Sequence, residues 1–581
     1  MANVNYRNTK VDHLTATVGL ELKAAQGIHY KSVDDLLGAN QWVDVDPFAE
    51  RDIKELATNI GLTQADIINV KQNNLQNPNA SAKKGDKFGY DYRINMANVK
   101  LWAQNEWSWN EVDFFYALQL TYSSMQRTTD MLNGRAWYLA RLGEQNNHHY
   151  YYLADAADEV LAAGDNLEQL PSRFVGYAHH FIDPSFKLGA TYKIDGRNQL
   201  KVNALAETKA PLARDAYISP RVHDRAVENI YRHDYARYYA MQDGTSWLTE
   251  YYGASQKMVG GDVTYSFNYP LVRGRVTGFY TQFWNGTELN GYYDDETRTF
   301  VNQSLTGINR RHMGIEAAAA VKLGLYFTLT GALSIGDYRY TSNALATTSA
   351  ENGMALAESR SGQPIYELRD SVLLKGLHVA TGPQLNTSLK LSFFHPKMWF
   401  ADITVNYFDW SYLDYAPARR MQGLFTGVRA DGSEVNGWYN EAMHTTDDKI
   451  AQINAQGGYP SNAVLGADGV PVLKYPYHIL SDQEMLTANN PLHRFLVDVS
   501  LGKLIYLKNR QSISINLTVN NLLNNTHFKT GGYQQARLPR QTIQGEDDRK
   551  NSVIGPNVWK FPSKYYYAWG TNFYLNIQYK F

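Results

Sequence analysis

Apolar and polar residues alternate along the last stretch of the chain, from Thr571 to Phe581. One parity carries Thr571, Phe573, Leu575, Ile577, Tyr579 and Phe581, and the other carries Asn572, Tyr574, Asn576, Gln578 and Lys580. Because successive side chains of a strand point to opposite faces, this stretch predicts a strand with one apolar and one polar face. A soluble sheet and a membrane-embedded sheet both produce such a strand, so the rest of the chain must decide between them.

The same alternation recurs along the whole chain and predicts about 14 strands. We expect a short helix as well, over Thr63 to Val70, after an N-cap-like Thr. The predicted strands cover residues 14–22, 94–107, 112–125, 186–192, 200–206, 263–269, 272–280, 313–323, 325–333, 385–393, 399–407, 495–501, 513–519 and 571–581.

The connections between these strands alternate between short and long. Short links lie near Asn110, Gly196, Pro270, Gly324, Pro396 and Asn509, and long links cover residues 26–91, 127–182, 210–255, 285–308, 342–375, 411–493 and 524–566. Soluble domains have no reason to place a long connection at every second turn, and a β-propeller has a fixed repeat without this alternation. Short periplasmic turns and long extracellular loops do produce it. The fold class we predict is therefore all-β, a transmembrane antiparallel β-barrel with long extracellular loops.

Composition supports this class. The 581 residues include 42 Tyr and no Cys, and 13% are aromatic, yet the mean hydropathy is only -0.45. Since no run of about 18 apolar residues exists, membrane-spanning helices are excluded. A chain can be polar on average and still sit in a membrane if only alternate residues face lipid. The formal net charge of -1 argues against a nucleic-acid partner, which would favour a basic surface.

Candidate chemistry is sparse. No motif for a nucleophile elbow, a zinc protease, a phosphate loop or a dinucleotide fold occurs, so we expect no enzyme, no catalytic residue and no cofactor. Two His pairs, at 148–149 and 179–180, have no third ligand to complete a metal site, and aromatic-rich loop tips explain them better. Two acidic runs, at 294–296 and 546–548, could take calcium or a cationic ligand, but solvated loop faces are the commoner explanation.

One long loop carries the densest group of aromatic and basic residues. Such side chains stack on sugars or aromatic chelators and pair with anions, although packing within the loop would also explain them. We treat this group as a candidate ligand-binding site. Its members are Tyr231, Arg232, His233, Tyr235, Arg237, Tyr238 and Tyr239.

Two further sets of residues follow from the barrel prediction. Four tryptophans near short turns are expected at the level of the lipid headgroups: Trp102, Trp107, Trp109 and Trp399. Polar residues on the lumen parity of the strands need no catalytic role, because they face water or protein inside the barrel. They are Lys201, Asn203, Glu207, Asp402, Thr404, Asn406, Asp498, Asn516 and Asn520.

Three stretches resemble the TonB-dependent outer-membrane receptors of Bacteroidota. Residues 29–31 read His-Tyr-Lys and are followed by Asp-Leu-Leu-Gly at 35–38, with Gly-Asp-Lys at 85–87 and Tyr-Asp-Tyr at 90–92. Residues 186–211 give a strand, an Asp-Gly-Arg-Asn turn and a Lys-Ala-Pro ending. Residues 519–524 read Val-Asn-Asn-Leu-Leu-Asn, and the chain closes on Tyr579-Lys580-Phe581. Each motif is weak alone, and their order and spacing carry the resemblance.

The resemblance implies an architecture and a function. Such receptors have a signal peptide, a TonB-contacting segment, a plug domain and a 22-strand barrel, and residues 1–10 show no signal-peptide pattern. We therefore expect residues 1–581 to be the carboxy-terminal part of such a barrel, lacking the plug, the TonB box and about eight strands. The strand over 14–22 should then pair with one that precedes Met1.

The implied role is active import across the outer membrane of a Gram-negative bacterium, for a scarce bulky nutrient: a siderophore, a glycan, cobalamin or a peptide. A plugless passive channel is the alternative. Implied partners are outer-membrane lipid, the plug and the missing amino-terminal strands, and the TonB complex. In many such receptors a surface lipoprotein caps the loops. Tyr579 and Phe581 would form the signal read by the barrel-insertion machinery.

Overall fold

The computed structural model describes residues 2–46, 68–134, 173–175, 178–217, 255–294, 299–350, 357–358, 364–365, 367–422, 464–465, 471–472, 483–536 and 562–581. Within these ranges the chain is almost entirely β-structure. Among the described helices, none is long and apolar enough to cross a bilayer.

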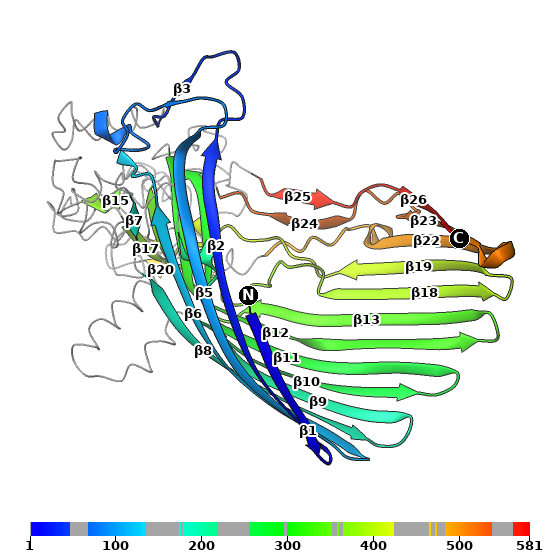
Figure 1. Cartoon of the computed structure of the whole chain (residues 1–581). Coiled ribbons are helices and arrows are strands. Elements are labelled where there is room, and N and C mark those ends of the chain that lie inside the picture. Colours follow the sequence, from blue (N-terminus) through cyan, green and yellow to red (C-terminus); the bar gives the residue numbers. More distant parts are fainter. Residues whose placement is uncertain are drawn as a thin grey trace.

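One antiparallel sheet of 18 strands dominates the described residues, and its long strands lie side by side in a single strongly curved layer (Figure 1). Its strands are β1 (Ala2–Val11), β2 (Leu14–Ser32), β5 (Lys87–Ser108), β6 (Val112–Thr129), β7 (Phe174–Val175), β8 (His179–Lys193), β9 (Asn198–Lys209), β10 (Gln256–Asn268), β11 (Val272–Asp294), β12 (Thr299–Leu323), β13 (Phe327–Tyr340), β14 (Ala344–Ala350), β17 (Glu367–Val372), β18 (Leu385–His395), β19 (Trp399–Asp409), β22 (Phe495–Tyr506), β23 (Ser512–Asn520) and β26 (Asn572–Lys580).

Each long strand pairs with its predecessor and its successor among the long strands, from β1 to β26. The other described elements are small. They are the hairpins β3 (Trp42–Val43) with β4 (Ser81–Ala82), β15 (Ala357–Glu358) with β16 (Pro364–Ile365), β20 (Val464–Leu465) with β21 (Pro471–Val472) and β24 (Lys529–Tyr533) with β25 (Lys564–Tyr567), and the helical turns α5 (Ala213–Ala216), η3 (Pro417–Arg420), η4 (Pro491–Arg494) and η5 (Lys508–Arg510).

Every strand predicted from the alternation is a strand of this sheet, and every predicted short turn joins the expected pair. The short turns gather at one end of the strands, and the strand ends that the long connections join lie at the other (Figure 1). We call these the short-turn end and the loop-side end. Of the predicted helix only Ile68 to Val70 fall within the described ranges, and these three residues are helical.

Two predictions about strand extent were wrong. The segment 285–308 is not a long loop, because β11 and β12 continue through it as a paired extension reaching Asp294 and Thr299. Likewise, β2 runs to Ser32 and β5 begins at Lys87. In the β11–β12 extension the apolar residues Leu305 and Ile308 fall on different parities across the register shift, so the alternation that reveals a strand is interrupted.

The expected partner of the Leu14 strand was also wrong. We expected a strand that precedes Met1, but β2 pairs with β1, with Val4 opposite Leu20 and Tyr6 opposite Val18. His13, in the left-handed conformation at φ 64°, closes the tight connection. Among the described pairings none joins β1 to β26, so these two strands form the edges of the sheet.

Aromatic rings lie over glycines on the polar face of the sheet. A Cβ at Gly19 would collide with Trp102, one at Gly502 with Phe400, and one at Gly336 with Tyr338. Trp102 and Phe400 stand opposite their glycines on the paired strand, so these two rings fill the space that the missing side chains leave and help fix the register. Tyr338 lies over Gly336 of its own strand. Trp102 therefore sits on the polar face, which differs from its predicted place at the headgroup level.

A bulge interrupts the β11–β12 pair near its loop-side end. The register shifts between Phe283 and Gly286 and again between Gly286 and Glu288. Asn285 adopts φ 57° there. A bulge bends its strand and can re-aim a side chain, and here it directs Glu288 toward Arg310 on the polar face.

Candidate functional site

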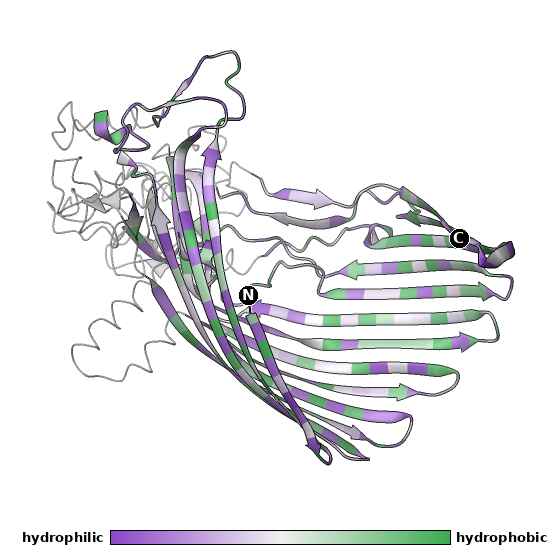
Figure 2. Cartoon of the chain, in the orientation of Figure 1, coloured by the Kyte–Doolittle hydropathy of each residue, from purple (hydrophilic) through white to green (hydrophobic). Residues whose placement is uncertain are grey.

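The first functional feature is a band of exposed apolar side chains on one face of the sheet, which we call the apolar band. Leu101, Ile315 and Leu389 are 53%, 54% and 52% exposed. Other members are Leu118, Val263, Ile403, Leu501 and Leu575. Green residues alternate with purple or white ones along the strands (Figure 2).

Register shows that the band is continuous. Ile315 stands opposite Ile335, Leu389 opposite Val405, and Leu517 opposite Leu575. Monomeric soluble proteins rarely expose contiguous apolar patches larger than a few hundred Å². A band that crosses the whole sheet therefore favours an apolar surrounding medium over water.

The opposite face is polar, and its side chains pair with one another across the strands. Asn203 donates to Asp262 at 2.9 Å and Asn406 donates to Asp498 at 3.0 Å. Lys390 pairs with Asp402 at 3.5 Å. The residues predicted to face a lumen thus lie on this polar face, where cross-strand contacts give Asn203, Asn406 and Asp402 a structural role.

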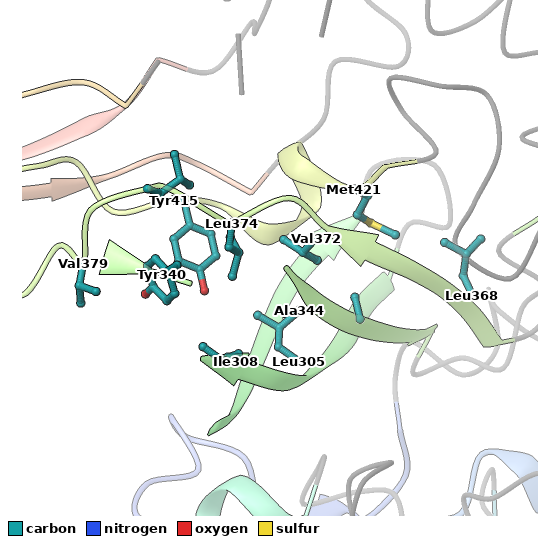
Figure 3. Close-up of a cluster of buried hydrophobic side chains, with 12 residues drawn as sticks. Leu305, Ile308, Tyr340, Ala344, Leu368, Val372, Leu374, Val379, Tyr415 and Met421 are labelled. Atoms are coloured by element: carbon teal, nitrogen blue, oxygen red, sulfur yellow. The ribbon is translucent and has the colours of Figure 1, made fainter. Parts of the chain in front are cut away.

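A compact core closes the loop-side end of β12 and β13, and we call it the loop-side core. Figure 3 shows Tyr340 and Tyr415 facing one another beside Val372, Leu374 and Met421. The two tyrosine rings are 5.4 Å apart, edge to face. Strands β12, β14 and β17 and residues 377–379 supply the rest, so the described parts of these long connections pack into a common core.

A group of ionisable residues lies beside this core, formed by Glu288, Arg310, Tyr340, Asp414 and Tyr415. Tyr415 donates a 3.4 Å hydrogen bond to Glu288, and Arg310 approaches the same carboxylate at 3.8 Å. Burial raises the pKa of Glu288 above its usual range, and the Arg310 charge opposes this shift. Because 38% of the Glu288 side chain is still exposed, water limits the size of the shift. Burial raises the pKa of Asp414 too.

A second group at the loop-side end stacks aromatic rings on cations. The His29 ring lies 4.8 Å from the Tyr92 ring and nearly parallel to it. The Arg127 guanidinium sits 4.1 Å from the Tyr92 centroid, and Lys31 sits 5.3 Å from that of Tyr90. Both groups lie on the polar face, where flat π surfaces and cations can hold a sugar or an aromatic anion.

Several sequence-predicted site residues lie outside the described ranges. These are Tyr231, Arg232, His233, Tyr235, Arg237, Tyr238 and Tyr239, the His pair at 148–149 and the acidic run at 546–548. Of the run at 294–296, Asp294 alone is described, as the last residue of β11. For these residues the ligand prediction stays a prediction.

The His pair at 179–180 is described, and its two rings have different neighbours. His179 is buried, with its ring 6.1 Å from that of Tyr217. His180 stacks on Tyr122 and shares a 2.7 Å hydrogen bond with its hydroxyl. Across the described residues, no group of three or more His, Cys, Asp or Glu side chains is placed to hold a metal ion.

Sequence reasoning missed the Glu288 group because its members come from four separate segments. Only the His29 stretch gave a signal, through the family motif that it carries. Tyr579 and Phe581 lie at the end of β26, with their rings 6.2 Å apart and both side chains exposed.

Comparison with known proteins found no matching family description and no matching curated protein. Solved structures do match. The ferric-catecholate import receptor Fiu from E. coli K12 is 11% identical, with a TM-score of 0.42, over 99% of this chain and 53% of its own. The ferric yersiniabactin uptake receptor FyuA from Yersinia pestis is 10% identical, with a TM-score of 0.45, and the match covers 99% of this chain and 52% of FyuA. The ferric citrate transporter FecA is 8% identical, with a TM-score of 0.40, and the match covers 99% of this chain and 53% of FecA.

These neighbours are TonB-dependent outer-membrane receptors. The chain spans about half of their length. Similarity at this level does not assign the chain to a family, and what these receptors import is a property of those proteins alone.

Proposed function

We propose that the sheet is part of the wall of an outer-membrane transport barrel, with its apolar face in lipid and its polar face toward a wet lumen. The apolar band carries this proposal. Strands β18 and β19 have 11 residues each, which gives a length of about 36 Å at about 3.3 Å per residue. Tilted by about 45°, such a strand rises about 25 Å, the height of the lipid-facing band of outer-membrane barrels.

Active import is the transport mode we propose, for a scarce bulky nutrient captured at the loop-side end. The sequence motifs that resemble TonB-dependent receptors support this mode. In it, a plug domain closes the lumen, the TonB complex supplies the energy, and β1 and β26 pair with further strands of a larger barrel. A siderophore, a glycan, cobalamin or a peptide fits this role, with the loop residues Tyr231 to Tyr239 as proposed contacts. A capping surface lipoprotein is a further proposed partner.

The membrane placement can be tested with single thiols, because the natural chain has no Cys. Leu389→Cys and Lys390→Cys are neighbours on β18 with opposite parity. After labelling with a fluorophore and reconstitution into vesicles of brominated lipid, the label at position 389 should be quenched strongly and the label at 390 weakly. Equal quenching at both positions would show that the apolar face is not in lipid.

The transport mode needs a separate experiment in the native host. Uptake of labelled candidate nutrients is compared in the wild type, a deletion of this protein and a deletion of the TonB complex. Active import predicts that both deletions lose uptake of the same nutrient. Uptake that requires this protein but not the TonB complex would instead identify a passive channel.

A further inference from the structure

A groove of about 810 Å³ runs along the apolar face between β9 and β13. Two glycines of that face, Gly261 and Gly278, leave space there. A Cβ added at Gly278 would meet nothing within 4 Å. Apolar side chains flank the gap: Val263, Tyr280 and Ile315. The groove is thus a shallow apolar channel in an otherwise continuous band.

Charged residues stand at the loop-side end of this groove. Asp337, one of its lining residues, accepts from Arg311 at 2.9 Å and from Arg339 at 2.6 Å. Register places all three on the apolar face, because Arg311 is opposite Arg339 and Asp337 is two residues from Ile335. Two guanidinium groups share one carboxylate, so this cluster keeps a net positive charge. We call Arg311 and Arg339 the arginine pair.

Aromatic and imidazole groups border the arginine pair. Trp410, 38% exposed, lines the same groove end. His378 lies 3.8 Å from Asp337 and stacks on Tyr412 with their centroids 3.8 Å apart. Burial lowers the pKa of His378, and the two arginines carry the positive charge here. Amphipathic rings at this height are typical of a lipid–water interface.

We propose that this groove and the arginine pair bind a phosphorylated lipid of the outer leaflet, with an acyl chain in the groove and a phosphate on the arginines. The inference rests on the proposed placement of the apolar face in lipid. Arg presents N–H donors in a planar fork that matches phosphate oxygens. Asp337 holds both guanidinium groups at the groove end, and the order of the two features, apolar below and cationic above, matches the order of tail and headgroup in a lipid.

Two variants separate the parts of this site. Arg311→Gln with Arg339→Gln removes the cations and keeps an uncharged polar side chain at each position. Gly278→Leu fills the groove at a position where a Cβ has room. Matched controls leave the site intact. Lys187→Gln with Lys390→Gln removes two cations from the polar face, where they pair with Glu207 and Asp402. Gly331→Leu adds a side chain on the apolar face outside the groove, where a Cβ meets only Leu389, at 3.9 Å.

The probe is diphosphorylated lipid A, titrated into detergent-solubilised protein and followed by native mass spectrometry. Two comparison ligands are titrated in the same way: dephosphorylated lipid A, which lacks the phosphates, and inorganic phosphate, which lacks the acyl chains. We expect the arginine variant to lose about tenfold or more of its affinity for lipid A, since charge-assisted hydrogen bonds to phosphate are lost. Gly278→Leu should also weaken lipid A binding, and both controls should bind like wild type. Inorganic phosphate alone should bind far more weakly than lipid A.

Three outcomes would overturn the proposal: wild-type affinity in the arginine variant, equal affinity for dephosphorylated lipid A, or inorganic phosphate binding as tightly as lipid A. Failure here remains distinct from failure of the membrane placement. Suppose that the label at position 389 is quenched by brominated lipid but the arginine variant binds lipid A with wild-type affinity. The apolar face would then lie in lipid, and only the proposed lipid A site would be wrong.

Discussion

An arginine placed at mid-height on β19 should reveal which face of the sheet meets lipid. Val405 stands between Leu389 and Val497 on the apolar face, and Thr404 stands between Lys390 and Asp498 on the polar face. Arginine at the midplane of the lipid-facing band costs about 2 to 4 kcal/mol. Val405→Arg should therefore lower the folded-to-unfolded ratio by about thirtyfold to a thousandfold. Thr404→Arg should be tolerated far better, because Asp498 offers a partner.

Depth adds a second check to this prediction. Trp399 lies on the same parity at the short-turn end, six residues before Val405, which is about 20 Å along the strand. Arginine near an interface costs only about 0 to 1 kcal/mol. Trp399→Arg should therefore lower the free energy of unfolding much less than Val405→Arg does. The assay is urea unfolding in lipid vesicles, followed by tryptophan fluorescence, together with the amount of assembled barrel in cells. Equal losses for Val405→Arg and Thr404→Arg would refute the assignment of faces.

Three further predictions follow from single positions. Deleting Phe581 should reduce insertion in cells more than it lowers the stability of folded protein, and equal membrane levels of deletion and wild type would contradict this. Gly314→Val should lower the free energy of unfolding by about 1 to 3 kcal/mol, because the added Cβ would collide with the backbone of Ile335. Gly331→Val on the same strand pair should cost much less, and unfolding midpoints compare the two. Because its folded pKa is raised, Glu288 contributes stability that is present below its usual pKa and is lost as pH rises through the folded value. Glu288→Gln should flatten that loss, as measured by hydrogen exchange of the loop-side end from pH 4 to 8, and an unchanged pH profile would argue against burial as the cause.

Strand alternation predicted most of the sheet, and its failures have a physical cause. Parity is visible only where one face is apolar and the other polar, which is why the strands were found at the height of the apolar band. The first strand was missed because Asn8 and Lys10 follow on the parity of Val4 and Tyr6 and end a short alternation after two apolar residues. The β11–β12 extension was missed because its apolar residues, such as Leu305 and Ile308, fall on different parities across the register shift.

The loop-side groups could not be predicted from local patterns. Glu288 depends on a bulge to reach Arg310, and Tyr415 comes from a segment more than a hundred residues further along the chain. The groove on the apolar face depends on the absence of side chains at two glycines on neighbouring strands. No periodicity marks such an absence, whereas the aromatic and basic loop over 231–239 was conspicuous in sequence.

The bulge at Asn285 also divides the β11–β12 pair into two parts that tolerate insertions and substitutions to different degrees. Below it, a one-residue insertion would turn every following side chain to the opposite face and place charges in the apolar band. Above it, the register has already slipped, and the two tips differ in burial: β12 carries the buried Val301 and Leu305, whereas the β11 tip from residue 289 to 294 is only partly buried. The bulge therefore separates the pairing of the tips from the pairing beneath: the β11 tip can gain, lose or exchange residues, and so acquire a new surface shape, without shifting the register below, while the buried side chains of β12 hold the other tip in place.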